Sequence, residues 1–362
     1  MVTVKVGQRF DDKYEVKEVI THRDSTVSVY IATDIETQEE VALKLSSNYY
    51  KLKREAKFYK SQVQPLEGFP ILRWFWKEKH RYGAYGVLAM DRLGPSLDSV
   101  MQKTREGKFS LKTTLQIMDQ VITRIQALHE RHFIHRGIKP DNFCIGPIGS
   151  KSEGMVYLID FDDVFEYISP YGNHFRDWGD NQGNRNWTSL AVDEGRQTIR
   201  RDDMESAGYM AVYFLKGWLP WHGHSSRNSH STMGYKKDTS LDDLCKDLPQ
   251  EFITYLAYCR SLEYTQQPDY DYCRRLFQRV FEREGFRDDG MYDWMAPQSA
   301  GESEKLIGQL SSGDVENSEQ SEESCSSAVS GDDTTVGHSL ISQPETTEAG
   351  PSQCVGLKLA RL

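Results

Sequence analysis

The first ninety residues contain short runs in which apolar and polar positions alternate. The runs "VSVYIAT" and "EEVALKL" are the clearest, and polar turns separate them. Alternation with a period of two is typical of strands with one buried face. The basic stretch "NYYKLKREAKFYKSQV" has helical spacing, and two further strand-like runs follow in "ILRWFWKEK" and "YGVLAMDRL". This part of the chain therefore predicts a small antiparallel sheet with one helix.

After "LGPSL" the spacing of apolar positions becomes helical. The stretch "SLKTTLQIMDQVITRIQALHERH" places Leu115, Met118, Ile122, Ile125 and Leu128 three and four positions apart, which predicts a long amphipathic helix. The stretch "MESAGYMAVYFLKGWLPW" is apolar nearly all round, as expected of a buried helix. "EFITYLAYCRSL" and "DYCRRLFQRVFERE" predict two more helices. The fold class is therefore α+β, with a small β lobe followed by a larger helical lobe.

The last part of the chain, residues 298–362, has a different composition. It contains no Phe, Trp or Tyr, 17 Ser or Thr residues, and 11 acidic against 3 basic residues. Such a segment cannot bury enough apolar surface to offset the entropy lost on ordering. We expect an acidic, disordered tail here, and it accounts for most of the net charge of −10.

The net charge and the cysteine pattern limit the kind of partner and the cellular compartment that we expect. An acidic chain is not expected to have nucleic acid as its main partner. The six cysteines form no C-x-x-C pair, so we expect reduced structural thiols in a cytoplasmic or nuclear protein. The start "MVTVKVGQRF" lacks the apolar core of a signal peptide, and no stretch is apolar enough to predict a membrane span.

Four polar residues follow the order and spacing required for phosphoryl transfer. Lys44 ends "VALK" on a predicted strand, and Glu55 in the basic helix could pair with it. Asn142 and Asp160, the latter opening "DFD" after an apolar strand, stand where two metal ligands are expected. This constellation predicts a site for a nucleotide and a metal ion.

Longer motifs resemble the casein kinase I family of serine/threonine protein kinases. They are "LGPSL", "FIHRGIKPDNF", "LIDFDDVFEY", "RRDDMESAGYM", "LPW" and "RSLEYTQQPDYDYCRRLF". The resemblance implies a bilobal protein kinase domain at 8–297, with an N-lobe at about 8–93 and a C-lobe at about 94–297.

The same resemblance implies ATP and Mg²⁺ in the cleft between the lobes, with protein substrates or partners. We expect the chain to be monomeric. Asn142 and Asp160 would hold the metal. By position, the adenine would lie against Ile20, Ala42 and Cys144, and the hinge would be Asp91, Arg92 and Leu93, after a gatekeeper at Met90.

The sequence departs from the family pattern in the catalytic loop. Gly137 occupies the position of the catalytic aspartate, while Lys139 is retained and could steady the transferring phosphoryl group. Loss of a positioned general base typically lowers a rate by about 10²–10⁴. Because the kinase transition state is loose, residual turnover is conceivable.

The glycine-rich loop over the phosphates is also lost. Its glycine positions fall at about His22, Asp24 and Val27, so the backbone cannot approach the phosphates as closely. Asp24 would add negative charge near a triphosphate, unless the turn bends away from the nucleotide.

Asp162 replaces the glycine of the metal-binding tripeptide, and Asp163 follows it. Either Asp162 is an additional metal ligand or the two residues form a solvated acidic turn. On the substrate side, the arginine expected to bind an acidic or phosphorylated substrate is replaced by Asn186, next to Arg185. Most basic positions of the following lysine-rich stretch are replaced in "GHSSRNSHSTMGYKK", which would weaken an anion pocket.

The structural frame of a kinase is retained. His135, Phe161 and Tyr59 occupy the positions of an internal column of side chains, and Asp203 would anchor the catalytic loop. A retained frame with altered chemistry favours a pseudokinase that acts as a binding, scaffold or regulatory protein in signalling. The alternative is a weak serine/threonine kinase that uses ATP and magnesium without a base.

Smaller signals lie outside this pattern. Serines three positions apart in "SEQSEESCSSAVS", from Ser318 to Ser330, could be phosphorylated in succession by an active casein kinase I, although a serine-rich tract gives such spacing by chance. Lys53, Lys57 and Lys60 at helical spacing indicate a solvated face, or else a contact with an acidic partner or nucleic acid. The terminal "LKLARL" is apolar again, with no indicated role.

Overall fold

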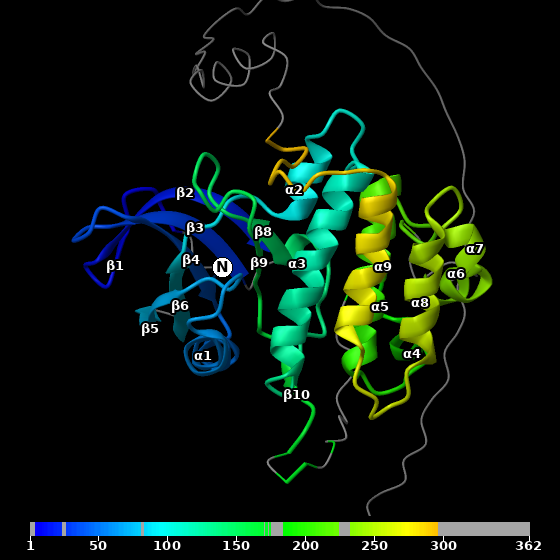
Figure 1. Ribbon diagram of the computed structural model, residues 1–362. Helices are drawn as coiled ribbons and strands as arrows, with labels where there is room; N and C mark the ends of the chain where they lie inside the picture. Colours follow the sequence, from blue (N-terminus) through cyan, green and yellow to red (C-terminus); the bar gives the residue numbers. More distant parts are fainter. Residues whose placement is uncertain are drawn as a thin grey trace, which may run out of the picture. The chain divides into compact units, whose positions relative to one another are not determined.

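The computed structural model describes residues 4–23, 27–80, 83–169, 171–172, 174, 184–223 and 232–295. These residues belong to one compact unit, residues 1–299. The predicted disordered tail, with its serine series and "LKLARL", lies outside the described residues. Figure 1 shows a sheet with one helix followed by a larger helical part, as the hydrophobic pattern predicts.

The sheet of the first lobe has six antiparallel strands in the order β1-β2-β3-β4-β6-β5. The side chains of Val16, Tyr30, Leu43 and Val87 form the buried face of this sheet. Because strand residues alternate between faces, Ala42 and Lys44 both point away from Leu43. The strands are β1 Arg9–Phe10, β2 Tyr14–Arg23, β3 Val27–Asp34, β4 Glu40–Ser46, β5 Leu72–His80 and β6 Gly83–Asp91.

The predicted basic helix is α1, Tyr49–Phe58, and it packs against β5 and β6. Asn48 caps its start, since the Asn48 Oδ1 atom accepts a hydrogen bond from Lys51 N at 3.0 Å. The last turn predicted from the spacing is wider than an α-helix: Tyr59–Val63 is a π-helical turn. Within it, Tyr59 and Val63 are both fully buried. The spacing of apolar residues predicts a helix here, but it does not predict the π-helical turn, which depends on this packing.

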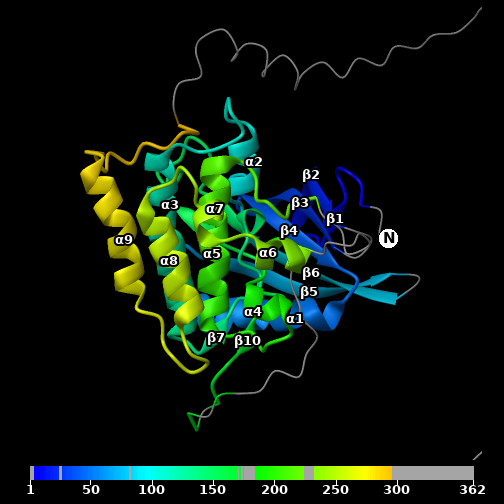
Figure 2. The ribbon, with the colours of Figure 1, turned by 90° about the vertical axis from the view of Figure 1, so that its right-hand side faces the viewer.

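The second lobe is built around α3, Leu111–His129, and α5, Arg200–Lys216. All five apolar positions of the predicted amphipathic helix are buried in α3. Figures 1 and 2 show these two helices running side by side with α8, Gln250–Ser261, and α9, Tyr270–Arg283. The shorter helices are α2 Leu97–Gln102, α4 Leu190–Asp193, α6 Thr232–Asp238 and α7 Leu241–Leu244.

Two short antiparallel strand pairs position the polar motifs between the lobes. Strand β7, Phe133–Ile134, pairs with β10, Phe165–Glu166. Strand β8, Phe143–Ile145, pairs with β9, Val156–Leu158, and a 3₁₀ turn at Pro140–Asn142 precedes β8. As a result, the loops 135–142 and 159–164 lie next to each other.

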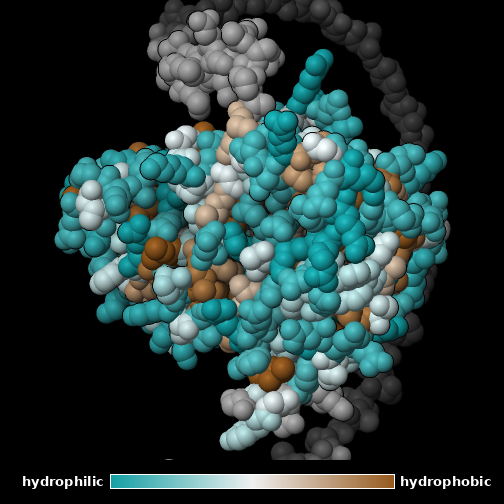
Figure 3. Space-filling view, in the orientation of Figure 1, coloured by the Kyte–Doolittle hydropathy of each residue, from teal (hydrophilic) through white to brown (hydrophobic). Residues whose placement is uncertain are grey.

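The surface in the view of Figure 3 is mostly hydrophilic, with apolar side chains in small separate patches. None of the helices in the described part of the chain is both long and apolar enough to cross a membrane. The four cysteines at 144, 245, 259 and 273 are buried and carry free thiols. The other two cysteines, Cys325 and Cys354, lie outside the described residues.

Candidate functional site

A cavity of about 400 Å³ lies where the sheet meets the helical lobe. It is lined by strand residues on one side and by Cys144 and Asp160 on the other. The register of β4 and β6 places Ala42 opposite Met90, so both face this cavity next to the segment 91–93. All the residues predicted for the adenine, the gatekeeper and the hinge line it: Ile20, Ala42, Met90, Asp91, Arg92, Leu93 and Cys144.

Lys44 forms two ion pairs at the inner end of this cavity. Its Nζ atom lies 2.9 and 2.8 Å from the two carboxylate oxygens of Glu55 and 2.5 Å from Asp160 Oδ1. Glu55 comes from α1 and Asp160 from the loop after β9, so three distant segments meet at one ammonium group. The predicted pairing of Lys44 with Glu55 is present in the structure.

Burial and charge have opposite effects at this group of side chains. Burial alone would lower the pKa of Lys44, but the adjacent carboxylates of Glu55 and Asp160 outweigh it and raise that pKa. Burial raises the pKa of Glu55 to about 7, with Lys44 acting in the opposite direction. Lys44 is therefore a permanent cation, suited to contact phosphate oxygens.

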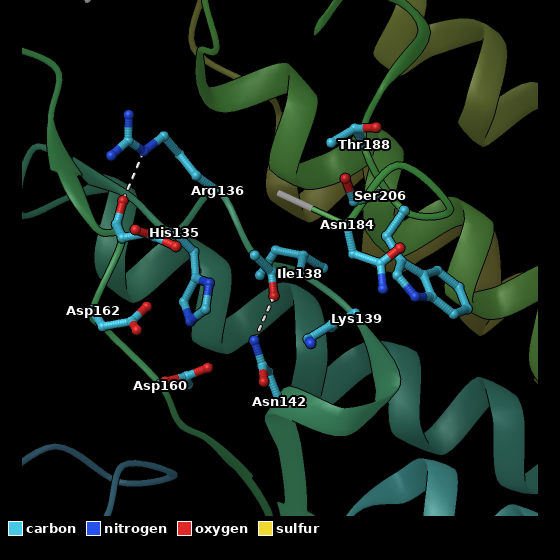
Figure 4. Close-up of a pocket in the computed structure, with 13 residues that line it drawn as sticks. His135, Arg136, Ile138, Lys139, Asn142, Asp160, Asp162, Asn184, Thr188 and Ser206 are labelled. Atoms are coloured by element: carbon cyan, nitrogen blue, oxygen red, sulfur yellow. Dashed lines mark hydrogen bonds between the residues drawn. The ribbon is translucent and has the colours of Figure 1, made fainter. Parts of the chain in front are cut away.

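Asn142 and Asp160 approach each other from opposite sides of the loop pair (Figure 4). Asn142 Nδ2 donates a hydrogen bond to Gly137 O at 2.9 Å. Its Oδ1 atom is buried and has no hydrogen-bond partner in the described structure. An amide oxygen with free lone pairs beside a carboxylate fits Mg²⁺, which binds through one or two protein oxygens together with substrate phosphates. Asp160 has a positive φ of 72°, in the left-handed region of the backbone.

The described residues contain no group of three or more His, Cys, Asp or Glu side chains arranged to hold a metal ion alone.

Gly137 lies in the catalytic loop with space for a side chain. A Cβ atom at this position would lie 3.3 Å from His135 Nδ1 and 3.4 Å from Asn142 Nδ2. Shifts of a few tenths of an ångström would accommodate it. A second cavity of about 230 Å³ extends from here along Lys139 and Thr188.

Asp203 anchors the catalytic loop, as the family resemblance implies. Its carboxylate accepts hydrogen bonds from His135 N at 2.7 Å, Arg136 N at 2.9 Å and His129 Nε2 at 3.0 Å. Burial would raise the pKa of Asp203, but the hydrogen bond from His129 reverses this effect and holds it below the ordinary value. The bonds also hold Arg136 at a φ of 63°, in the left-handed region.

The predicted internal column is assembled. The ring of Phe161 lies 4.9 Å from that of Tyr59 and 5.3 Å from that of His135, measured between centroids. The column joins the π-helical turn after α1, the loop after β9 and the catalytic loop. It therefore links the end of the helix that carries Glu55 to the loop that carries Asp160.

The protein kinase domain model matches residues 23–268, more than half of the chain. This chain belongs to the protein kinase family. Lys44, Glu55, Asn142 and Asp160 all lie within the matched range, and the predicted bilobal kinase fold is confirmed. Protein kinase domains generally bind ATP and Mg²⁺ and act on or with proteins. The casein kinase I type, the 8–297 boundary and the individual roles of the site residues stay predictions.

The acidic turn of this kinase domain has a partner that the sequence did not reveal. Lys51 of α1 lies 3.1 Å from Asp162 Oδ2 and 3.0 Å from Asp163 Oδ1. The turn is thus neither fully solvated nor free, because it is tied to α1 by two ion pairs. Burial and the charge of Asp160 raise the pKa of Asp162. Whether Asp162 also binds metal stays a prediction.

The substrate side of the kinase domain is described only in part, because residues 224–231 lie outside the described structure. The backbone carbonyls of Arg185 and Asn186 both accept hydrogen bonds from side chains. Arg185 O accepts one from Lys236 Nζ at 2.6 Å, and Asn186 O accepts one from Trp221 Nε1 at 2.8 Å. Lys236 is fully buried and pairs with Asp193 at 2.7 Å. This lysine therefore stabilises the fold and is not available to an anion pocket.

The altered phosphate loop is also described only in part. Asp24 and the His22 side chain lie outside the described structure, while Val27 lines the cavity of about 400 Å³. The choice between a loop that repels phosphate and one that bends away therefore stays open.

Proposed function

We propose that this kinase domain is a pseudokinase of the casein kinase I type that acts in signalling by binding other proteins, with phosphotransfer impaired. The observation that carries the proposal is Gly137 at the position of the base. The nearby carboxylates of Asp162 and Asp163 are both engaged by Lys51, and Asp160 by Lys44. In the described structure, no uncommitted carboxylate lining the catalytic loop cavity replaces the missing one.

The same geometry supports retained binding of nucleotide and magnesium. Lys44 would contact the phosphates, and Asn142 Oδ1 and Asp160 would hold the metal ion. Bound magnesium would neutralise negative charge on the phosphates. Lys139, which lines the cavity beside Gly137, would lie near the transferring group.

The missing base alone lowers the expected rate by about 10²–10⁴, or ~3–5 kcal/mol of transition-state stabilisation. This deficit is compatible with a slow enzyme, so a weak serine/threonine kinase is the second candidate. It is favoured by the assembled column of Tyr59, Phe161 and His135 and by the Lys44–Glu55 pair, since both are features of an active arrangement.

The test is transfer of labelled γ-phosphate from ATP to an acidic casein-type substrate. The native chain is compared with Gly137→Asp and with Gly137→Asn, which has nearly the same volume but cannot act as a base. We expect an undetectable or very slow native rate and a rise of at least about tenfold only in Gly137→Asp. A clearly detectable native rate within threefold of that of Gly137→Asp would overturn the proposal.

Nucleotide binding is measured in parallel as the shift in melting temperature with ATP and Mg²⁺. A magnesium-dependent shift with all three proteins inactive supports a binding function without catalysis. Asp160→Asn is the control, since it removes the metal carboxylate and should abolish the magnesium dependence.

A further inference from the structure

Helix α1 borders a groove on the face turned away from the nucleotide cavity. The groove has a volume of about 750 Å³ and runs between α1 and β5. Figure 1 shows α1 lying beside β5 and β6. We call it the α1 groove and define it by the cations Lys53, Arg54, Lys57 and Lys60 and the aromatic residues Tyr50 and Trp74.

The charge of the α1 groove is not neutralised. All four cations are exposed, and their side chains form no hydrogen bond or ion pair within the described structure. No Asp or Glu lines the groove. The neighbouring Lys51 shows the contrast, because it is held by two aspartates. Arg73, at the edge of the groove, is likewise paired with Asp91 at 2.6 Å.

The aromatic residues give the same groove an apolar wall. The side chain of Tyr50 is 76% exposed and that of Trp74 is 47% exposed. Single exposed apolar side chains are ordinary, but two large ones sharing a groove indicate a contact surface. Leu72 and Phe75 continue this wall, and both are packed against the core.

The groove is preformed because the other face of α1 is fixed. Leu52, Ala56 and Phe58 are buried in the core, and Glu55 is held by Lys44. A rigid helix presenting cations beside an apolar wall lowers the entropy lost on binding.

We propose that the α1 groove binds an acidic segment of a partner protein, with a large apolar side chain of that segment packed against Tyr50 and Trp74. The acidic character follows from the four exposed cations, whose side chains have no ion-pair partner within the described structure. A long polyanion such as nucleic acid fits less well, because the net charge of −10 repels it more strongly than it repels a short segment with a few carboxylates. Bases can also stack on Tyr50 and Trp74, so the test includes nucleic acid as a competing occupant. This inference rests on the proposed binding function, since it names the class of partner.

The test uses the full chain and a fluorescein-labelled peptide of Asp and Glu residues with one central Phe. Fluorescence anisotropy gives the Kd at low and high salt. The groove variant is Lys53→Glu, Lys57→Glu and Lys60→Glu combined. The matched control is Lys103→Glu, Lys246→Glu and Arg279→Glu, three exposed cations elsewhere with the same total charge change.

We expect the groove variant to raise the Kd at least about tenfold and the control to raise it less than about threefold. Tyr50→Ser should weaken binding of the Phe peptide but not of a peptide with Ser in its place. Because every altered side chain is exposed, the melting temperatures should change little, which a thermal scan checks. Equal losses in both triple variants, or no binding by the native chain, would overturn the proposal.

Two other occupants are tested by competition. A synthetic peptide of residues 314–333, which is acidic and lacks Lys and Arg, represents the chain's own tail. A single-stranded oligonucleotide represents nucleic acid. If either displaced the probe at lower concentration than the unlabelled acidic peptide, the partner assignment would be wrong. Loss of groove binding leaves the phosphotransfer comparison of Gly137→Asp untouched, so the two proposals fail separately.

Discussion

Replacing Asp203 should destabilise the kinase domain strongly, because its carboxylate accepts hydrogen bonds from two buried donors and one partly buried donor. The backbone amides of His135 and Arg136 and the His129 ring all donate to it. Burial lowers the pKa of His129, so this ring is neutral near pH 7. In this neutral ring Nε2 carries the proton and donates a hydrogen bond to Asp203, while Nδ1 accepts a hydrogen bond from Tyr270 Oη at 2.8 Å.

The magnitude follows from the unsatisfied donors. Leaving one buried donor without a partner costs about 1–3 kcal/mol, and such costs are not fully additive. Asp203→Ala should therefore lower the free energy of unfolding by ~3–5 kcal/mol, a large part of the 5–15 kcal/mol typical of a domain. Asp203→Asn keeps one acceptor oxygen but turns an N–H group toward a donor, so we expect a smaller loss of ~2–3 kcal/mol.

Urea unfolding followed by tryptophan fluorescence measures this loss. Asp238→Ala on the exposed face of α6 is the control, with an expected change below ~0.5 kcal/mol. Hydrogen exchange of the amides at 135 and 136 should accelerate in Asp203→Ala well before global unfolding. A loss below ~1 kcal/mol, with both amides still protected, would refute the anchoring role.

Two further predictions concern carboxylates. Burial raises the pKa of Asp202 from 3.8 to about 7. Its protonated form is thus favoured in the folded state, and the stability it contributes is lost as pH rises from about 4 through 7. As the pH rises from about 5.5 to 8.5, the free energy of unfolding of Asp202→Asn should fall by ~2 kcal/mol less than that of the native chain. Urea unfolding at each pH measures this difference, and parallel pH profiles for the two proteins would contradict it. Asp162→Gly should leave the Kd for ATP with Mg²⁺ unchanged or lower, because Asp162 is engaged by Lys51; calorimetry showing a tenfold weaker Kd would instead make Asp162 a metal ligand.

The periodic elements of this kinase domain were predictable from the sequence alone. The apolar spacing from Leu115 to Leu128 is long and regular, and every position in it is buried. The residues predicted for the adenine and the hinge line one cavity, because motif order determines which strands and loops carry them; their roles stay predictions. These features depend on local pattern and on chain order.

Contacts between distant polar residues were not predictable in the same way. Lys51 and Asp162 lie on separate elements, and neither carries a local signal for the other. Lysine is almost never fully buried, so no sequence pattern predicts that Lys236 lies inside the fold. The π-helical end of α1 depends on the burial of Tyr59 and Val63 against other segments.

Helix α1 carries Glu55 on its inner face and Lys53 and Lys57 on its outer face. Because one short helix serves both sides, a ligand that displaces it from outside also changes the distance from Glu55 to Lys44. Thermodynamic linkage makes such an effect reciprocal: if a groove ligand tightens nucleotide binding by some factor, the nucleotide tightens the groove ligand by the same factor. If the two sites are coupled in this way, the ATP concentration would set the affinity of the groove for its ligand even without phosphotransfer.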